Sequence, residues 1–258
     1  MTTFTQLLAA ELRRDPGHPF LTWYDEGTGE RVELSVTTYA NWVAKVSSLL
    51  ADEHDLERGD VLLVDLPNHW LGPVFLGAAW TVGLAVAFPS SAGGAETVPT
   101  AVVTGPASLT DWAPRADDLT VLACSLLPMG VRFAEALPPG VHDVGVEVWG
   151  QPDAFTAYDP PDGTDVALVD GPVTQDELFT ASAGTEAPVI GSSVAAGSSE
   201  NSTGGNRLLS TANPASPPGV AAVSRPLVSS GSLVLVAGAD PVRLEAITVA
   251  ERVTHRFG

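Results

Sequence analysis

The feature that most constrains this sequence is a regular alternation of apolar, strand-like runs with helix-like segments over residues 1 to about 125. Residues 61–66 and 84–88 are short apolar runs, and residues 70–82 between them have the length and composition of a helix. Strands that are apolar on both faces and alternate with crossover helices are typical of parallel sheets. The pattern therefore predicts an α/β fold.

Further segments extend this pattern toward both ends of the chain. Residues 37–52 carry apolar side chains at the three- and four-residue spacing of an amphipathic helix. Asp240 and Pro241 supply an N-cap and a first-turn proline for a helix that runs to about residue 252. The other expected elements are helices at 5–14 and 219–230, a hairpin of 20–24 with 31–34, and strands at 165–169, 207–210, 232–236 and 253–257. These elements predict two packed sub-domains with mostly parallel sheets flanked by helices.

Composition divides the chain into three parts. Residues 1–127 form a first α/β sub-domain, and residues 128–164 are rich enough in proline and glycine to predict a connection. Residues 165–258 form a second α/β sub-domain. Within it, residues 181–206 are mostly small or polar, so little apolar burial is available to offset the entropic cost of ordering them. We expect a flexible loop over this segment.

The charge balance limits the partners of this protein. The sequence has 12 basic against 31 acidic residues, a net charge of −19, and Lys45 is its only lysine. Such a chain has no cationic surface to gather phosphates, so we expect no nucleic-acid partner.

Apolar patterning predicts a soluble, cytoplasmic protein without a membrane partner. The longest apolar stretch, residues 71–88, is interrupted by glycines and a proline, which favours a packed helix and strand over a membrane span. The amino terminus lacks the apolar core of a signal peptide. The single cysteine, Cys124, lies in an apolar run and is expected to be a buried structural thiol.

Two stretches resemble, in the same order, the N-terminal lobe of the AMP-binding, adenylate-forming enzymes of the acyl-CoA synthetase type. The first stretch, residues 4–89, matches in the turn at Gly59 and Asp60, the step at Pro67 and Asn68 after a strand, and the run 83–89. The second, residues 207–258, matches in the run 231–236 and the pair Asp240 and Pro241. The chain is most similar to a short actinobacterial family that is itself distantly similar to these enzymes. The resemblance implies ATP, AMP or CoA as candidate cofactors.

The phosphate-gripping loop of that family has no counterpart here. In the family, a Ser-, Thr- and Gly-rich loop with a lysine follows the strand that corresponds to residues 165–169. Here Asp170 and Gly171 follow instead, with no lysine, and residues 182–185 offer only a polar linker. Adenylation brings two anions together and depends on cations and aligned N–H donors, and the later motifs of the family would lie beyond Gly258. The resemblance thus implies the scaffold without its catalytic residues.

The sequence still offers two groups of candidate ligand contacts. Asp170, Gly171 and Thr174 are candidates for cofactor contact, although Thr174 and Glu177 also fit a capping box at a helix start. Ligands of open α/β sheets bind beyond the carboxyl ends of strands, which makes the triplet after residues 61–66 a candidate crevice lining. That triplet is Asn68, His69 and Trp70. The alternative is that Asn68 caps a helix, His69 is exposed and Trp70 is in the core.

No catalytic or metal-binding constellation can be assembled from sequence spacing. His142 and His255 have no partner at the spacing of a triad or of metal ligands, so the sequence predicts neither a catalytic residue nor a metal site.

Three hypotheses about function follow. The first is a divergent, shortened AMP-binding-like protein that no longer catalyses and has a binding or regulatory role. The second is an adenylate-forming half-enzyme, an acid–thiol ligase in class, that is completed by a partner chain. The third is a structural interaction module, because a final strand at 253–257 would leave an open sheet edge for a second copy or a partner chain.

Overall fold

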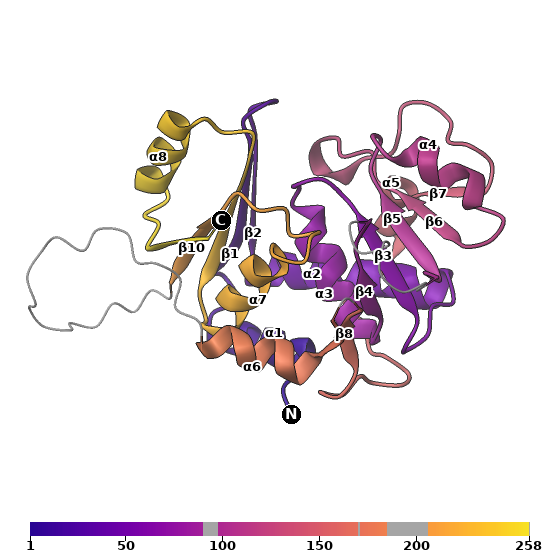
Figure 1. Ribbon diagram of the computed structural model, residues 1–258, viewed down its shortest axis with the longest axis horizontal. Helices are drawn as coiled ribbons and strands as arrows, with labels where there is room; N and C mark the ends of the chain where they lie inside the picture. The colour runs from indigo at the N-terminus through magenta and orange to yellow at the C-terminus, as the bar shows by residue number, and fades with distance from the viewer. Residues whose placement is uncertain (90–97, 170, 185–205, 258) are drawn as a thin grey trace, which may run out of the picture.

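The computed structural model describes residues 1–89, 98–169, 171–184 and 206–257, and their strands form two separate sheets (Figure 1). The five-stranded sheet has the order β12-β10-β11-β1-β2 and the seven-stranded sheet the order β7-β6-β5-β3-β4-β8-β9. Figure 1 shows two long helices, α2 and α3, in the space between the sheets.

The five-stranded sheet joins the two ends of the chain. Its strands are β1 (Pro19–Asp25), β2 (Glu30–Ser35), β10 (Arg207–Ser210), β11 (Ser232–Ala237) and β12 (His255–Phe257). The hairpin β1–β2 is antiparallel and the other neighbours are parallel, with Leu21 of β1 opposite Leu233 of β11. The amino-terminal hairpin therefore completes a sheet whose other strands lie near the carboxyl end of the sequence.

The seven-stranded sheet is parallel except at one edge. Its strands are β3 (Val61–Asp65), β4 (Ala85–Ala87), β5 (Ala101–Thr104), β6 (Thr120–Ala123), β7 (Val141–Asp143), β8 (Val166–Leu168) and β9 (Val173–Thr174). β8 and β9 form an antiparallel pair, and all other neighbours run parallel. β4 and β5 are buried at every position, as expected of strands covered on both faces.

Helices surround and separate the two sheets. The α-helices are α1 (Phe4–Arg14), α2 (Val36–Ser48), α3 (Leu71–Val82), α4 (Leu109–Trp112), α5 (Val144–Glu147), α6 (Gln175–Gly184), α7 (Val220–Val228) and α8 (Pro241–Ala250). Shorter turns are the π-helical η1 (Leu49–Glu53) and the 3₁₀ turns η3 (Ala113–Arg115), η4 (Pro128–Gly130) and η5 (Val148–Gly150). Local signals fix several ends: Ser35 caps α2, Asp240 caps α8, and left-handed Gly83 ends α3.

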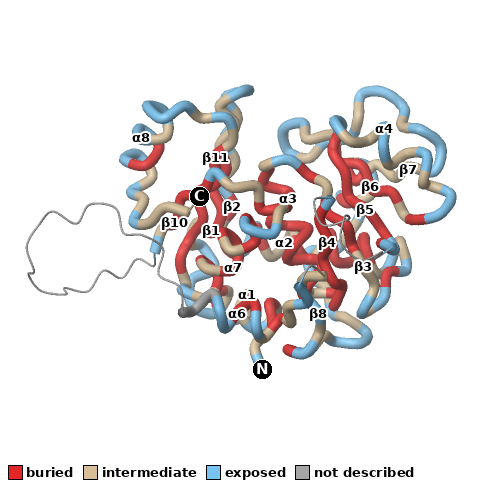
Figure 2. The backbone as a smooth tube through the Cα atoms, in the orientation of Figure 1, coloured by how far each residue is buried: buried red, intermediate tan, exposed pale blue. Residues whose placement is uncertain are grey.

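The main core lies around α2, α3 and the strands beside them, where many residues are coloured as buried in Figure 2. Phe4 of α1 packs against Tyr39 of α2 and Trp80 of α3, with ring centroids 6.5 and 5.7 Å away. Gly77 permits this approach, because a Cβ there would lie 2.7 Å from Phe4 Cζ and 2.7 Å from the Tyr39 hydroxyl oxygen. The central helices therefore pack between the sheets, with α2 against β1 and β2 and α3 against β3 and β4.

The α/β fold class predicted from sequence is confirmed: two mostly parallel sheets are flanked by helices. The sheets do not follow the predicted sequence ranges, however. Strands β8 and β9 come from the range 165–258 but extend the seven-stranded sheet, and the Pro- and Gly-rich range 128–164 contributes its edge strand β7. Of the expected loop at 181–206, residues 181–184 end helix α6, and residues 185–205 lie outside the described residues.

Helix lengths bear on the membrane question. Among the described residues, no helix is long and apolar enough to cross a membrane.

Candidate functional site

Two adjoining cavities lie between the sheets, and both are lined by Glu30 and Pro128. The larger, which we call the strand-end cavity, has a volume of about 800 Å³. The smaller, which we call the tryptophan pocket, has a volume of about 560 Å³. Both volumes are in the range of small-molecule sites.

The strand-end cavity lies where strands of both sheets end. From the five-stranded sheet it is lined by Asp25, the last residue of β1, and Ala237, the last residue of β11. From the seven-stranded sheet it is lined by the chain after β3 and the chain after β6. The residues after β3 are Pro67, Asn68 and His69, and the residues after β6 are Leu126, Leu127 and Pro128. This is the place at which open α/β sheets bind their ligands.

Asn68 links the two sheets across this cavity. Its side-chain nitrogen donates to the backbone carbonyl oxygens of Thr211 and Val236, each at 3.1 Å, and its backbone carbonyl oxygen accepts from Trp23 Nε1 at 3.2 Å. The alternative interpretation of Asn68 as a helix cap is wrong, because α3 begins after Trp70 and has no side-chain cap. The amide is instead engaged by backbone of the other sheet, a contact that the local sequence does not show.

His69 is buried beside Asn68 and is neutral at physiological pH. Its Nδ1 accepts a hydrogen bond from the Leu71 backbone N–H at 3.2 Å, so the proton of the neutral ring is on Nε2. Burial lowers the pKa of His69 to about 4, against an opposing effect of the Asp25 carboxylate. Nε2 has no hydrogen-bond partner among the described residues. The alternative of an exposed His69 is wrong, since only 3% of the residue is accessible.

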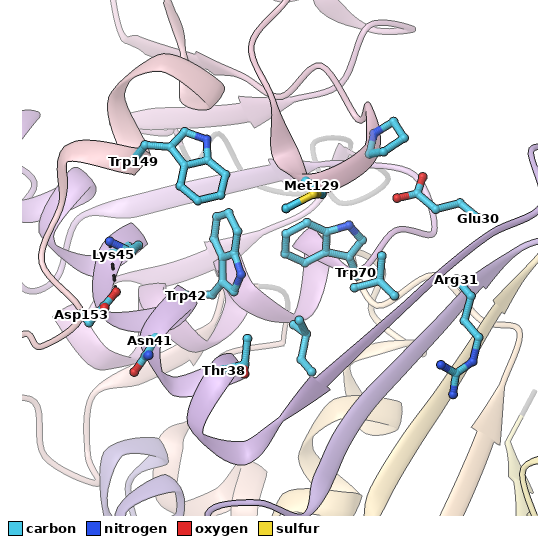
Figure 3. Close-up of a pocket in the computed structure, with 13 residues that line it drawn as sticks. Glu30, Arg31, Thr38, Asn41, Trp42, Lys45, Trp70, Met129, Trp149 and Asp153 are labelled. Carbon is cyan, nitrogen blue, oxygen red and sulfur yellow. Dashed lines mark ion pairs between the residues drawn. The ribbon is translucent and has the colours of Figure 1, made fainter.

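Three indole rings form the tryptophan pocket. Trp42 of α2 packs edge-on against Trp70 at 5.0 Å and against Trp149 of η5 at 5.4 Å between ring centroids. Figure 3 shows these rings gathered beside Met129, which has a left-handed backbone with φ of +63°. Trp70 is 1% exposed, and its Nε1 finds no acceptor within the described part of the chain. The pocket is therefore an aromatic surface with a buried N–H donor beside it.

The basic groups that line this pocket are already paired. Lys45 Nζ lies 3.0 Å from Asp153 Oδ1, drawn as a dashed line in Figure 3, and donates to the Gln151 carbonyl. Arg31 pairs with Glu33 at 2.6 Å and with Glu251 at 3.1 Å. The described residues therefore direct no unpaired basic side chain at the tryptophan pocket, whose lining is mainly aromatic and apolar.

The other predicted cofactor contacts lie on the tight hairpin between β8 and β9. Gly171 is exposed with φ of +60°, which suits a turn, and Asp170 lies outside the described residues. Thr174 and Glu177 form the capping box proposed as the alternative: the Thr174 N–H donates to Glu177 Oε2 at 2.9 Å and the Glu177 N–H donates to Thr174 Oγ1 at 3.2 Å. The structure brings none of these described residues into either cavity.

Sequence reasoning identified part of the cavity lining. Of the predicted triplet, Asn68 and His69 line the strand-end cavity and Trp70 lines the tryptophan pocket. It missed Trp42, Trp149 and Met129 as pocket residues. Trp42 fits the apolar period of its helix equally well whether it is in a core or lines a pocket. The other possible signals were Trp149, which is exposed, and the Pro-Met-Gly turn at Pro128–Gly130.

Comparisons with known proteins give a relative along the whole chain and a fold shared with larger enzymes. No family model matches the sequence. A Mycobacterium tuberculosis H37Rv protein described as "TIGR03089 family protein" is 32% identical over 263 residues, covering 99% of this chain and 99% of the relative.

Solved structures with the same fold are acyl-CoA synthetases. An acyl-CoA synthetase of Brucella canis matches 97% of this chain with a TM-score of 0.73 and 18% identity, over 46% of its own length. The N-terminal domain of FACL13 from Mycobacterium tuberculosis matches 98% with a TM-score of 0.67 and 15% identity, over 62% of its length. Acetoacetyl-CoA synthetase from Streptomyces lividans matches 97% with a TM-score of 0.69 and 16% identity, over 41% of its length. The chain thus spans about half the length of these enzymes and has the fold of their N-terminal part.

Proposed function

This chain belongs to the TIGR03089 family and has the fold of the N-terminal part of acyl-CoA synthetases, and from this premise we propose that it is a catalytically inactive binding protein of that superfamily. Its ligand is a small, largely apolar molecule with a hydrogen-bond acceptor, such as a carboxylic acid. The observation that carries the proposal is the tryptophan pocket with the unpartnered N–H of Trp70 beside it.

The chemistry of the pocket supports this ligand class. Trp42, Trp70 and Trp149 offer ring faces and edges on which an acyl chain or an aromatic ring packs, and an aromatic ring would gain about 0.5–1.5 kcal/mol per ring pair beyond its buried area. The Trp70 Nε1–H is a donor only and is buried, so a ligand that reaches it after a small side-chain movement would meet it with an oxygen acceptor. Since the solved relatives are named as acyl-CoA synthetases, carboxylic acids are the first compounds to try.

The absence of catalysis is proposed from the turn that stands in place of a phosphate loop. β8 and β9 pair as a hairpin with Leu168 opposite Val173, and in the sequence only residues 169–172 connect them. The one lysine, Lys45, lies in the tryptophan pocket and is paired with Asp153. Adenylation depends on cations around the triphosphate, and loss of one such group costs roughly 2–4 kcal/mol of barrier, so the lack of a lysine between β8 and β9 supports the proposal that this chain does not adenylate acids by itself.

The test is isothermal titration with decanoate and with benzoate. We expect saturable binding of at least one acid, weakened about tenfold or more by Trp149→Ala, which removes an exposed wall of the pocket with little effect on folding. The matched control is Trp112→Ala, which removes a tryptophan that donates to Asp65 outside both cavities and should leave the affinity unchanged. Equal affinities for all three proteins, or no binding of either acid, would contradict the proposal.

A second candidate function keeps the chemistry and is favoured by the strand-end cavity. This cavity lies at strand ends of both sheets and is lined by the neutral His69, so a nucleotide could bind there, with a partner chain supplying the cations for catalysis. Thermal unfolding with ATP, AMP, Mg²⁺ and CoA tests this, since a ligand at a hundredfold excess over its Kd adds about 2.7 kcal/mol to stability. An ATP-dependent rise in Tm, with pyrophosphate release on addition of carboxylic acids, would favour the half-enzyme and refute the inactive binding protein.

A third candidate, an interaction module, is favoured by the edge strand β12. Within the described part of the chain, β12 pairs with β10 alone, so its other side is open to a strand of a second copy or of a partner. Light scattering after size-exclusion chromatography distinguishes the cases: a dimer that is lost on His255→Pro supports pairing through β12, and a monomer at high concentration excludes self-pairing.

A further inference from the structure

The structure gathers two histidines and a glutamate into one cluster away from both cavities. His54 follows η1, His142 is in β7 and Glu147 is the last residue of α5. Glu147 Oε2 lies 2.8 Å from His54 Nε2, and Glu147 Oε1 lies 3.1 Å from His142 Nδ1. The interpretation of His142 as having no partner at ligand spacing is therefore wrong, because its partners come from a distant helix end and from the next short helix.

We propose that His54, His142 and Glu147 bind a divalent transition metal ion, with Zn²⁺ as the best match. Two imidazole nitrogens and one carboxylate oxygen are a ligand set that zinc uses in proteins, with water in the fourth position. This site is separate from the proposed binding function and does not depend on it.

The distances fit such a site with little rearrangement. Zinc lies about 2.0–2.2 Å from nitrogen and carboxylate oxygen ligands, so two ligand atoms in a tetrahedron are about 3.3–3.5 Å apart. One Glu147 oxygen lies 2.8 Å from His54 Nε2 and the other lies 3.1 Å from His142 Nδ1, and one ligand atom from each of the three residues can be chosen so that all three lie within 4.8 Å of one another. Side-chain rotations of the two histidines and the glutamate would bring these atoms to the separations of a tetrahedral site.

The surroundings favour a cation and allow it to enter. The His54 side chain is 6% exposed, which anchors one ligand, while 41% of the His142 side chain is accessible and opens the cluster to solvent. The net charge of −19 attracts cations to the surface. His54 also directly follows a π-helical turn, Leu49–Glu53, a distortion that is frequent at functional sites.

Binding would exchange hydrogen bonds for coordination without further chemistry. In the metal-free cluster, the two ring nitrogens that face Glu147 donate N–H bonds to its carboxylate. When the ion enters, each ring would give it the lone pair of the nitrogen that faces Glu147 and carry its N–H on the other ring nitrogen, and the carboxylate would give an oxygen lone pair. The ion would tie β7 and α5 to the end of η1.

The experiment uses tag-free, chelator-treated protein and ZnCl₂ alone as the probe. We expect Zn²⁺ to bind at a 1:1 ratio and raise the Tm, and Co²⁺ to give the visible spectrum of a tetrahedral site. His142→Ala should weaken binding about tenfold or more and remove that spectrum. His255→Ala, which removes a histidine from the distant strand β12, should match the unmodified protein.

A second variant covers the case in which His142→Ala disturbs folding. Glu147→Gln keeps an oxygen and nearly the same shape but removes the ionised ligand, so it should also weaken Zn²⁺ binding about tenfold or more while the protein stays folded by circular dichroism. Equal Zn²⁺ affinity in the unmodified protein, His142→Ala and Glu147→Gln would overturn the proposal, as would the absence of binding at about 100 μM Zn²⁺.

Discussion

Replacing His69 with asparagine should make this protein less sensitive to mild acid. The folded protein holds the pKa of His69 near 4 because the ring is buried, whereas a histidine in an unfolded chain has a pKa of about 6.5. Between these pH values the unfolded state binds a proton that the folded state does not. The free energy of unfolding therefore falls as the pH decreases from about 6.5 to about 4, and His69 has no effect on it above that window.

The size of the effect follows from the two pKa values. If the pH fell through the whole window between the two pKa values, His69 would lower the free energy of unfolding by about 3 kcal/mol. Between about pH 7.5 and about pH 5.5 it lowers the free energy of unfolding by about 1.4 kcal/mol. Asparagine is the best replacement, because its side-chain oxygen can accept the hydrogen bond that the Leu71 N–H now donates to His69 Nδ1. The substitution thus removes the titration and keeps the local turn.

Urea unfolding at the two pH values measures this loss in both proteins. Every other titratable group is common to them, so their contributions cancel in the difference between the two pH dependences. The unmodified protein should lose about 1.4 kcal/mol more than His69→Asn on going to about pH 5.5. If both proteins lose the same amount, His69 is not held neutral by burial, and its assignment as a Nε2–H donor in the strand-end cavity fails.

Two further predictions concern the core. Gly77→Ala should destabilise the protein by about 1–3 kcal/mol in urea unfolding, because the new Cβ would lie 2.7 Å from both Phe4 Cζ and the Tyr39 hydroxyl oxygen, and both rings are fully buried. In the control Gly72→Ala, also in α3, no atom lies closer than 3.7 Å to the new Cβ, so stability should not fall, and equal losses in the two variants would contradict the packing argument. Cys124 should resist a disulfide reagent at neutral pH until urea unfolds the chain, because burial raises the pKa of its thiol, and rapid labelling of the folded protein would show that it is accessible.

Local signals predicted the elements of this fold, while long-range pairing decided how they assemble. The apolar run ending near residue 236 and the Asp240-Pro241 cap are complete within a few residues, so β11 and the start of α8 were predictable. The register of β1 against β11 joins opposite ends of the chain, and nothing in either segment alone specifies it. The predicted sequence ranges therefore do not coincide with the two sheets.

The candidate site, like the assembly of the fold, was only partly predictable from the sequence. The position of Asn68 and His69 after a buried strand was enough to predict a crevice, because strand ends in parallel sheets meet at one edge. Their environment was not predictable, since His69 is buried by Trp23 of the other sheet, 4.4 Å away between ring centroids. The pairing of His142 with His54 was equally invisible, because the two residues lie far apart in the sequence and their rings meet only through the packing of β7 and η1.

The two cavities are linked by a requirement of hydrogen bonding. His69 Nε2 and Trp70 Nε1 are buried N–H donors on consecutive residues, and neither has an acceptor among the described residues. An unsatisfied buried donor costs about 1–3 kcal/mol, so a small side-chain movement that admits an acceptor from the neighbouring cavity would stabilise each of them. Because the cavities adjoin at Glu30 and Pro128, one elongated ligand with two acceptor groups could satisfy both donors, whereas a ligand confined to the tryptophan pocket satisfies one. A dicarboxylic acid should therefore lose affinity on His69→Asn, and a monocarboxylic acid of the same length should not, so titrating both acids against both proteins decides whether the cavities act as one site.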